Sequence, residues 1–361
     1  MSLASFDLLR HAQVGLDTYV FKLDCNCDVT AVAAATSEHS ICLLDPASLA
    51  QVQCLGGHDD IVEDVAFFQA SPACLVSCSH DGSARVWDLR AAGACAQRFE
   101  VASNEVYSCT VGCGDAALAC AASEKVHLFD LVAGKRRRVY SDYHTDVVNR
   151  VRFHPAEPTK LLSGAEDGLV VVADTRESST SEAMLAVVPN EECVRGFTLV
   201  GPGRDTLCCV STTEDVRIWG LGPDDCGSKQ AEFVGLREHA LLSRDDSGGY
   251  VVETFYDQPS NQVFLLAGAG GGGDMLLFQL APGGAAPVAQ LSAGDGAAGH
   301  TGIVRSALCL PGGIIVTAGE DGRVCAWRET SSADQAEQFG LEPTAYGAQR
   351  SGAGSGRAAP Y

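Results

Sequence analysis

A serine, a histidine and an aspartate stand close together in residues 77–90, "SCSHDGSARVWDLR". These residue types form the catalytic triad of many hydrolases, in which serine attacks the substrate, histidine takes its proton and aspartate orients the histidine. Such a triad occurs once per enzyme and needs an exposed serine beside an oxyanion hole. Whether this segment does chemistry therefore depends on the elements that position it and on whether the same residues recur.

Short apolar segments that end in aspartate recur along the chain at an almost constant interval. Asp45, Asp88, Asp130 and Asp174 end the first of these segments and lie 42 to 44 residues apart. The series continues less regularly at 216–220, 275–279 and 324–328, which makes seven units. A period of roughly 40–45 residues is typical of propellers and related repeat arrays.

Each unit has the pattern of β-structure. In the second unit four apolar-rich runs, "VEDVAFF", "ACLVSCS", "SARVWDL" and "AQRFEV", are separated by the turn segments "QASP", "HDG" and "RAAG". Four short strands with such punctuation form an antiparallel meander. Seven meanders arranged radially cover one another's faces and leave only short edges. We therefore predict an all-β fold.

The second unit, "GGHDDIVEDVAFFQASPACLVSCSHDGSARVWDLR", resembles a WD40 repeat with its Gly-His start and Trp-Asp finish, and the units beginning at Tyr143 and Gly299 resemble it too. The resemblance implies one seven-bladed WD40 β-propeller over residues 1–329, closed by an N-terminal strand at 5–10 that pairs with the last blade. The expected blades are approximately 17–55, 56–101, 102–142, 143–190, 191–249, 250–298 and 299–329. The Gly/Ala/Ser-rich residues 330–361 are expected to be a disordered tail.

WD40 repeats contain a hydrogen-bonded network of His, Ser or Thr, Asp and Trp, and the resemblance gives this role to residues of three units. The network maps to His58, Ser77, Asp81 and Trp87, to His144, Ser163 and Asp167 with Ala173 in place of Trp, and to His300, Thr317, Asp321 and Trp327. Because the Ser–His–Asp group recurs, we interpret it as structural and predict no catalytic residues. His80, the neighbour of Asp81, is expected to be a solvent-facing turn residue.

The remaining sequence argues against a cofactor or a metal ion. The pattern G-x-G-x-x-G at Gly268, Gly270 and Gly273 is followed by the β-like run "DMLLFQL" and no helix, so it lacks the helix N-terminus of a dinucleotide site. Among 16 cysteines there is no C-x-x-C pair at zinc-site spacing. We expect free thiols in a reducing compartment, cytoplasmic and/or nuclear, because no secretory signal or membrane span is recognised.

Charge restricts the partners. The formal net charge of −21 repels nucleic-acid backbones and favours partners with basic segments. The alternative interpretation is that the acidity only keeps the protein soluble. The only basic run, "GKRRRV" at 134–139, is expected to be a solvated turn and edge strand, with an acidic-peptide or phosphate contact as the other option.

Two main functions remain, with an enzyme of novel type as a remote third class. The family resemblance implies the first, a noncatalytic scaffold for protein–protein interaction. The alternative is a substrate receptor that docks on the adaptor of a cullin-RING ubiquitin ligase, because Trp87, Asp88 and Arg90 resemble the Trp-Asp-x-Arg end of that docking motif. Asp174 and Arg176 form a second copy with Ala173 for Trp, and Ala84 also departs from the pattern. The other interpretation of Arg90 is a turn cap.

Overall fold

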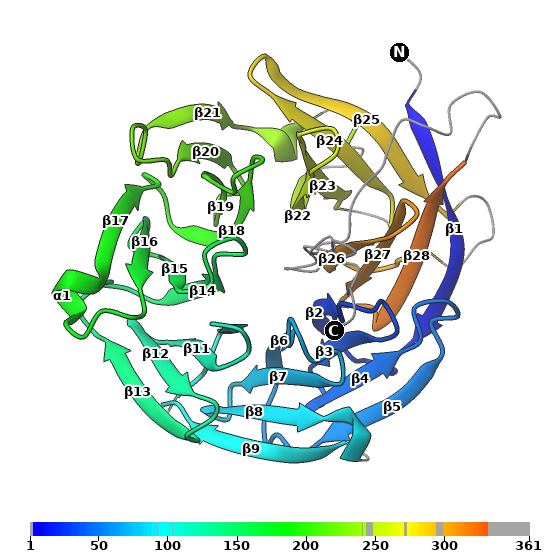
Figure 1. Cartoon of the computed structure of the whole chain (residues 1–361). Helices are drawn as coiled ribbons and strands as arrows, with labels where there is room; N and C mark the ends of the chain where they lie inside the picture. Colours follow the sequence, from blue (N-terminus) through cyan, green and yellow to red (C-terminus); the bar gives the residue numbers. More distant parts are fainter. Residues whose placement is uncertain are drawn as a thin grey trace, which may run out of the picture.

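The computed structural model describes residues 3–330 except 92, 103, 240, 243–247, 271–272 and 294–298. The predicted tail at 330–361 lies outside the described residues apart from Thr330. The described strands form a ring of sheets around a central axis (Figure 1). The all-β propeller fold predicted from the repeats is therefore confirmed. Besides the strands, the described residues contain three short helical segments: η1 (Leu89–Ala91), α1 (Thr180–Ala183) and η2 (Leu236–Glu238).

Five sheets contain four consecutive antiparallel strands each, with the first strand nearest the axis. Blade 1 comprises β2 (Val20–Cys25), β3 (Val32–Thr36), β4 (Ser40–Leu44) and β5 (Gln51–Gly56). Blade 2 comprises β6 (Val62–Phe67), β7 (Cys74–Ser79), β8 (Ser83–Asp88) and β9 (Ala94–Glu100). Blade 3 comprises β10 (Ser108–Gly112), β11 (Ala117–Ala122), β12 (Lys125–Asp130) and β13 (Lys135–Tyr140). Blade 4 comprises β14 (Val148–Phe153), β15 (Lys160–Ala165), β16 (Leu169–Asp174) and β17 (Met184–Pro189), and blade 5 comprises β18 (Val194–Val200), β19 (Thr206–Ser211), β20 (Val216–Gly220) and β21 (Lys229–Phe233).

The remaining strands belong to one eight-stranded sheet that closes the ring. Blade 6 comprises β22 (Gly249–Asp257), β23 (Gln262–Ala269), β24 (Met275–Ala281) and β25 (Gly284–Ser292). Blade 7 comprises β26 (Val304–Leu310), β27 (Ile314–Gly319), β28 (Arg323–Glu329) and, from the other end of the chain, β1 (Ala4–Gln13). β1 pairs antiparallel with β28 and, through residues 4–7, parallel with β25. The arrangement matches the seven units counted in the sequence, and the N-terminal strand is longer than the predicted 5–10.

Apolar side chains fill the space between neighbouring blades. One cluster joins Leu43 of β4 to Val65 of β6, and another joins Leu44 of β4 to Leu308 of β26. A cluster of the same kind lies at each junction around the ring. The core is thus divided among the junctions, and each blade is held by the faces of its two neighbours.

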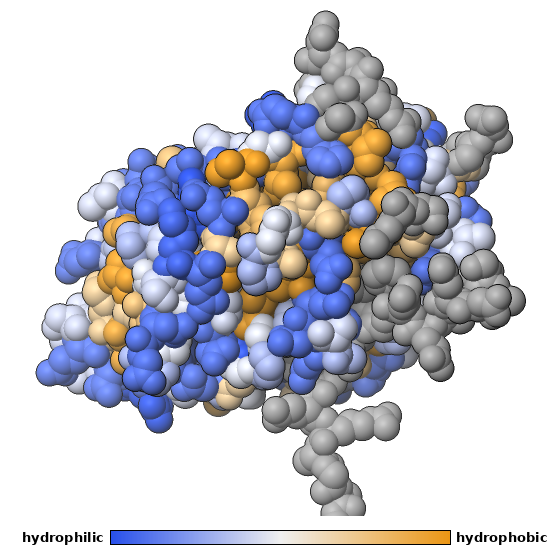
Figure 2. Space-filling view, turned by 90° about the horizontal axis from the view of Figure 1, so that it is seen from above, coloured by the Kyte–Doolittle hydropathy of each residue, from blue (hydrophilic) through white to orange (hydrophobic). Residues whose placement is uncertain are grey.

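The molecule has two loop faces and an outer rim. Asp81, in the turn between β7 and β8, defines the Asp81 face, and Arg90, just after β8, defines the opposite Arg90 face, because β7 pairs antiparallel with β8 between them. Figure 2 views the rim from the side of β21 and β25 and shows a hydrophobic area among hydrophilic residues. Val234, directly after β21, is one of the exposed apolar side chains of blade 5.

Candidate functional site

The Ser–His–Asp group of blade 2 is brought together as a chain of hydrogen bonds. His58 lies before β6, Ser77 lies in β7 and Trp87 lies in β8. His58 Nδ1 is 2.8 Å from the Asp81 carboxylate, and His58 Nε2 is 2.8 Å from Ser77 Oγ. Trp87 Nε1 donates to the same Ser77 Oγ at 2.8 Å. The hydroxyl that would act as the nucleophile is therefore buried and engaged on two sides.

The turn that holds Asp81 depends on its own short-range bonds. The Asp81 carboxylate accepts hydrogen bonds from the backbone N–H and the hydroxyl of Ser83, at 2.9 and 2.6 Å. Gly82 has a φ of +79°, and a Cβ there would lie 2.5 Å from the carbonyl oxygen of Ala102, so only glycine fits. Burial opposes ionisation, but the bonds from Ser83 and His58 hold the pKa of Asp81 below its usual range. Burial also lowers the pKa of His58, which favours a neutral ring.

The other two predicted networks have the same arrangement. In blade 4, His144 is 2.8 Å from Ser163 Oγ and 3.1 Å from the carboxylate of Asp167. Ala173 occupies the place of Trp87, so the indole N–H of blade 2 has no counterpart at this position. In blade 7, His300 is 2.8 Å from Thr317 and 3.1 Å from Asp321, and Trp327 donates to Thr317 at 2.8 Å.

His80 does not face solvent as predicted. Its ring packs edge-on against Tyr107 at 5.8 Å between centroids, and its Nε2 lies 3.4 Å from the carboxylate of Glu63. The close contact with the Glu63 carboxylate raises the pKa of His80. The residue is half-buried because the Tyr107 ring, which precedes β10 of the next blade, covers it.

The two predicted docking pairs lie on the Arg90 face and have matching geometry. Arg90 donates from Nε and Nη2 to the carboxylate of Asp88, at 2.9 and 2.8 Å. Arg176 donates in the same way to Asp174, at 3.1 and 2.7 Å. Both arginine side chains are nevertheless more than 70% exposed, at 74% and 72%. Each pair thus forms a local turn that presents a fixed guanidinium to the surface.

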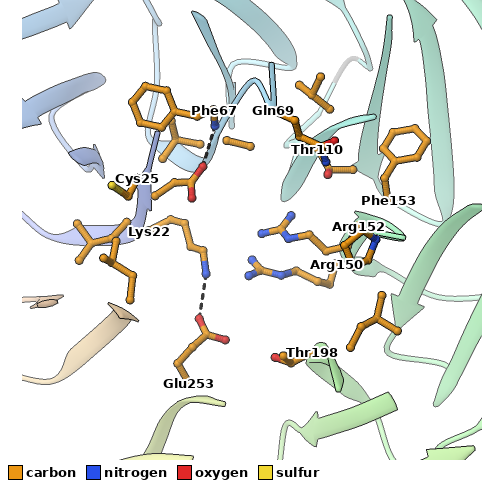
Figure 3. Close-up of a pocket in the computed structure, with 18 of the residues that line it drawn as sticks. Lys22, Cys25, Phe67, Gln69, Thr110, Arg150, Arg152, Phe153, Thr198 and Glu253 are labelled. Carbon is orange, nitrogen blue, oxygen red and sulfur yellow. Dashed lines mark hydrogen bonds and ion pairs between the residues drawn. The ribbon is translucent and has the colours of Figure 1, made fainter. Parts of the chain in front are cut away.

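The structure adds an axial site that sequence reasoning missed. A cavity of about 160 Å³ on the ring axis is lined mainly by the first strands of the blades and by the loops that follow them. Lys22, Arg150, Arg152 and Glu253 project into it (Figure 3). Because the lining includes Gln69 and Pro155, which follow β6 and β14, the cavity opens toward the Arg90 face.

A repeated bulge sets the side chains at the axis. The first strands of blades 1, 2, 4, 5, 6 and 7 have a buried valine at or near their start, and the pairing register shifts directly after it. A bulge bends its strand and re-aims the following side chain. In four of these strands the residue after the bulge is charged, namely Lys22, Asp64, Arg150 and Glu253. Aligning the repeats on that valine is the signal that could have found them.

Ion pairs at the axis join blades that are not neighbours. Lys22 of blade 1 contacts Glu253 of blade 6 at 2.9 Å, and Asp64 of blade 2 contacts Arg152 of blade 4 at 3.1 Å. Burial alone would raise the pKa of Asp64, but Arg152 and Arg150 hold it at about 2. Asp24 differs, because burial raises its pKa to about 6 although it accepts the backbone N–H of Phe67 at 2.7 Å.

Hydrogen bonds also link adjacent first strands. Between blades 7 and 1, the Leu23 N–H donates to Ser306 Oγ at 3.0 Å, and between blades 6 and 7 the Val304 N–H donates to the Tyr250 hydroxyl at 2.8 Å. Between blades 2 and 3, Ser108 donates to Asp64 at 2.8 Å. The inner wall of the ring is therefore a connected polar layer inside the apolar junctions.

Chemistry elsewhere in the described residues is limited. Gly268 lies within β23, Gly270 directly follows that strand, and the next described element is the strand β24 and not a helix. Within the described part of the chain, no three or more potential metal-ligating side chains gather into one group. A search of the same residues finds no helix of the length and apolarity needed to cross a membrane.

Known proteins share this repeat along most of the chain. A family model for "WD domain, G-beta repeat" matches residues 49–88, which contain the blade 2 network. "WD repeat-containing protein GTS1" of Arabidopsis thaliana is 30% identical over 334 residues, covering 88% of this chain and 83% of that protein. This chain belongs to the WD repeat family.

Further relatives cover different shares of the chain. "WD repeat-containing protein 89 homolog" of Dictyostelium discoideum is 28% identical over 321 residues, covering 88% of this chain and 85% of that protein. "Target of rapamycin complex subunit wat1" of Schizosaccharomyces pombe is 26% identical over 153 residues, covering 42% of this chain and 46% of that protein. The first similarity covers most of this chain, whereas the second covers less than half of it.

Proposed function

We propose that this WD repeat protein is a noncatalytic scaffold that binds other proteins through its loop faces. The observation that carries the proposal is the state of Ser77, whose hydroxyl is buried and bonded to both His58 and Trp87. A nucleophile needs an exposed oxygen and an oxyanion hole. The His–Ser/Thr–Asp chain of hydrogen bonds recurs in blades 4 and 7, although blade 4 lacks the bond from tryptophan. What the ring offers instead is a rigid frame with loops on two faces.

The acidity of the chain favours partners that carry basic segments. Interaction is tested by cross-linking mass spectrometry on the tagged full-length protein in its native cells. Two charge-reversal variants identify the face: Arg90→Glu with Arg176→Glu on the Arg90 face, and Asp60→Arg with Asp146→Arg on the Asp81 face, where both aspartates are exposed. Loss of a defined set of cross-linked proteins with one variant and not with the other supports the scaffold. Identical, partner-free profiles for the wild type and both variants contradict it.

Absence of catalysis is part of the same proposal. In a broad hydrolase screen, we expect the purified wild-type protein and the Ser77→Ala variant to give the same result, with no turnover that depends on Ser77. A turnover that disappears in this variant, while circular dichroism shows an intact fold, would identify an enzyme.

A second candidate function is docking on the adaptor of a cullin-RING ubiquitin ligase. It is favoured by two Asp-x-Arg pairs of equal geometry with exposed guanidinium groups on one face. Arginine offers a planar fork of donors that suits an interface. A pulldown with purified adaptor is expected to recover the wild type and to lose the double variant Arg90→Ala, Arg176→Ala. Arg98→Ala, which removes a partly exposed arginine from β9, is the matched control. Equal recovery of all three proteins rejects docking.

A further inference from the structure

Three cationic side chains approach one another at the ring axis. Figure 3 shows Arg150 and Arg152 extending from blade 4 toward Lys22 of blade 1, with the cavity between them. The approach has an electrostatic cost, since Arg150 is among the causes that lower the pKa of Lys22, after burial. Like charges that converge on a hollow need an anion to balance them.

The carboxylates present at the axis balance these cations only in part. Glu253 contacts Lys22 at 2.9 Å, and Asp64 contacts Arg152 at 3.1 Å. Arg150 is held less closely, at 3.8 Å from Asp64, and its Nε is buried with no hydrogen-bond partner among the described residues. A buried donor of a charged group that lacks a partner is costly, so Arg150 has capacity for a further acceptor.

The outer part of the cavity adds a fourth cation and hydroxyl groups. Arg204 lines it and is positioned by its contact with the Tyr256 ring, 4.6 Å from the centroid, and by a hydrogen bond to the Leu199 carbonyl at 2.9 Å. Thr110 and Thr198 lie on the same wall. Four cationic residues line the cavity against two acidic ones, Asp24 and Glu253, in a chain whose formal net charge is −21.

We propose that the axial cavity binds a phosphate-type dianion, free or as part of a ligand, between Lys22, Arg150 and Arg152. A tetrahedral oxyanion presents acceptors in several directions, which suits donors that approach from blades 1 and 4 on opposite sides of the axis. A carboxylate is planar, and its own substituent occupies one side. The formal net charge of −21 repels long polyanions, so the site selects a small or singly phosphorylated ligand over a nucleic acid.

Sulfate is the first probe, because its charge does not change between pH 5 and 8. Isothermal titration of the full chain with sodium sulfate, at an ionic strength held constant with sodium chloride, measures the affinity without general salt effects. Arg150→Gln is expected to weaken binding roughly tenfold, the cost of one charge-assisted hydrogen bond. Arg305→Gln is the matched control, since Arg305 pairs with Glu320 near the Asp81 face. Asp24→Asn, which removes a negative charge from the lining, is expected to tighten binding at pH 8.

The outcomes decide the proposal. Binding by the wild type and by Arg305→Gln, weakened in Arg150→Gln and tightened in Asp24→Asn, supports it. No binding by folded wild-type protein overturns it, and so does equal affinity of the two arginine variants. Inorganic phosphate and phosphoserine then distinguish the sources: tighter binding of phosphoserine indicates a phosphorylated ligand, and tighter binding of inorganic phosphate indicates the free ion.

Discussion

The polar networks inside the blades and the ion pairs at the axis are both buried, but they connect the chain over different distances. In blade 2, His58 is 19 residues from Ser77 and 23 residues from Asp81. At the axis, Asp64 is 88 residues from Arg152, and Lys22 is 231 residues from Glu253. The first kind fixes the shape of a single repeat, whereas the second exists only when separate blades have met.

This difference in sequence separation indicates that the two kinds of polar cluster stabilise different parts of the molecule. A network within a repeat consists of neutral groups and one carboxylate, each with a near neighbour in sequence. The axial cluster is charged and draws its partners from blades 1, 2, 4 and 6. Damage to the networks should therefore weaken one blade, and damage to the cluster should weaken the ring.

The largest effect is expected from Asp64→Ala. Asp64 is almost fully buried beside Arg152 and Arg150, so its removal leaves two charges without their main partner. Breaking a buried pair in this way costs about 3–5 kcal/mol of unfolding free energy. Urea unfolding measures it, with Glu320→Ala as the control, because Glu320 pairs with the exposed Arg305 and should change stability by less than about 1 kcal/mol. Equal losses in the two variants would contradict a special role for the axis.

The comparison between blades 2 and 4 gives the next largest effect. Ser77→Ala leaves His58 Nε2 and the Trp87 N–H without a partner, whereas Ser163→Ala affects only His144 Nε2, because Ala173 replaces Trp. Each unsatisfied buried group costs about 1–3 kcal/mol, so Ser77→Ala should be worse by at least about 1 kcal/mol. Thermal unfolding of both variants measures the difference. A larger loss for Ser163→Ala would show that the indole bond contributes nothing.

The two aspartates of the axis are expected to respond to pH in opposite directions. Burial raises the pKa of Asp24 to about 6, although the nearby cations Lys22 and Arg152 oppose this shift. The folded protein therefore keeps a proton on Asp24 that the unfolded chain releases above about pH 4. Stability that involves Asp24 therefore falls as pH rises from about 4 to about 6. The pKa of Asp64, near Arg150, is lowered to about 2, so its contribution is present above about pH 4 and is lost below it.

Melting temperatures of Asp24→Asn and wild type across pH 4–8 test this contrast. The variant is expected to gain stability relative to wild type as pH rises, because it has no buried carboxyl group whose ionisation would destabilise the folded state. A difference that does not change with pH would place the Asp24 titration outside this range.

The smallest effect on stability is expected from Arg90→Ala and Arg176→Ala. Both side chains are exposed, and each pairs with the aspartate two residues earlier. Surface pairs of this kind contribute little, so the melting temperature of the double variant should equal that of the wild type within error. A clear drop would show that these turns stabilise the blades, and it would complicate their use in docking tests.

The fold and the blade networks could be predicted because each depends on residues close together in the sequence, and the same spacing recurs from repeat to repeat. His58 lies a fixed distance before Ser77 and Asp81, and the same spacing to a serine and an aspartate recurs from His144. The axial residues share only the valine two residues before them, and no spacing along the chain pairs Lys22 with Glu253, because they meet only when the ring closes. His80 was placed wrongly for the same reason, since Tyr107, the residue that covers it, belongs to the next blade.

The strand β1 has a consequence for the order of folding. Its antiparallel partner β28 lies some 300 residues further along the chain. The side chain of Gln13, at the end of β1, donates to the carbonyl oxygen of Asp321, which lies 308 residues later in the turn before β28. Pairings at such separation slow folding, because the intervening chain must be ordered or looped out first. A circular permutant that moves β1 to follow β28 converts this pairing into a local hairpin, so blade 7 could form from one continuous segment and the ring should assemble faster.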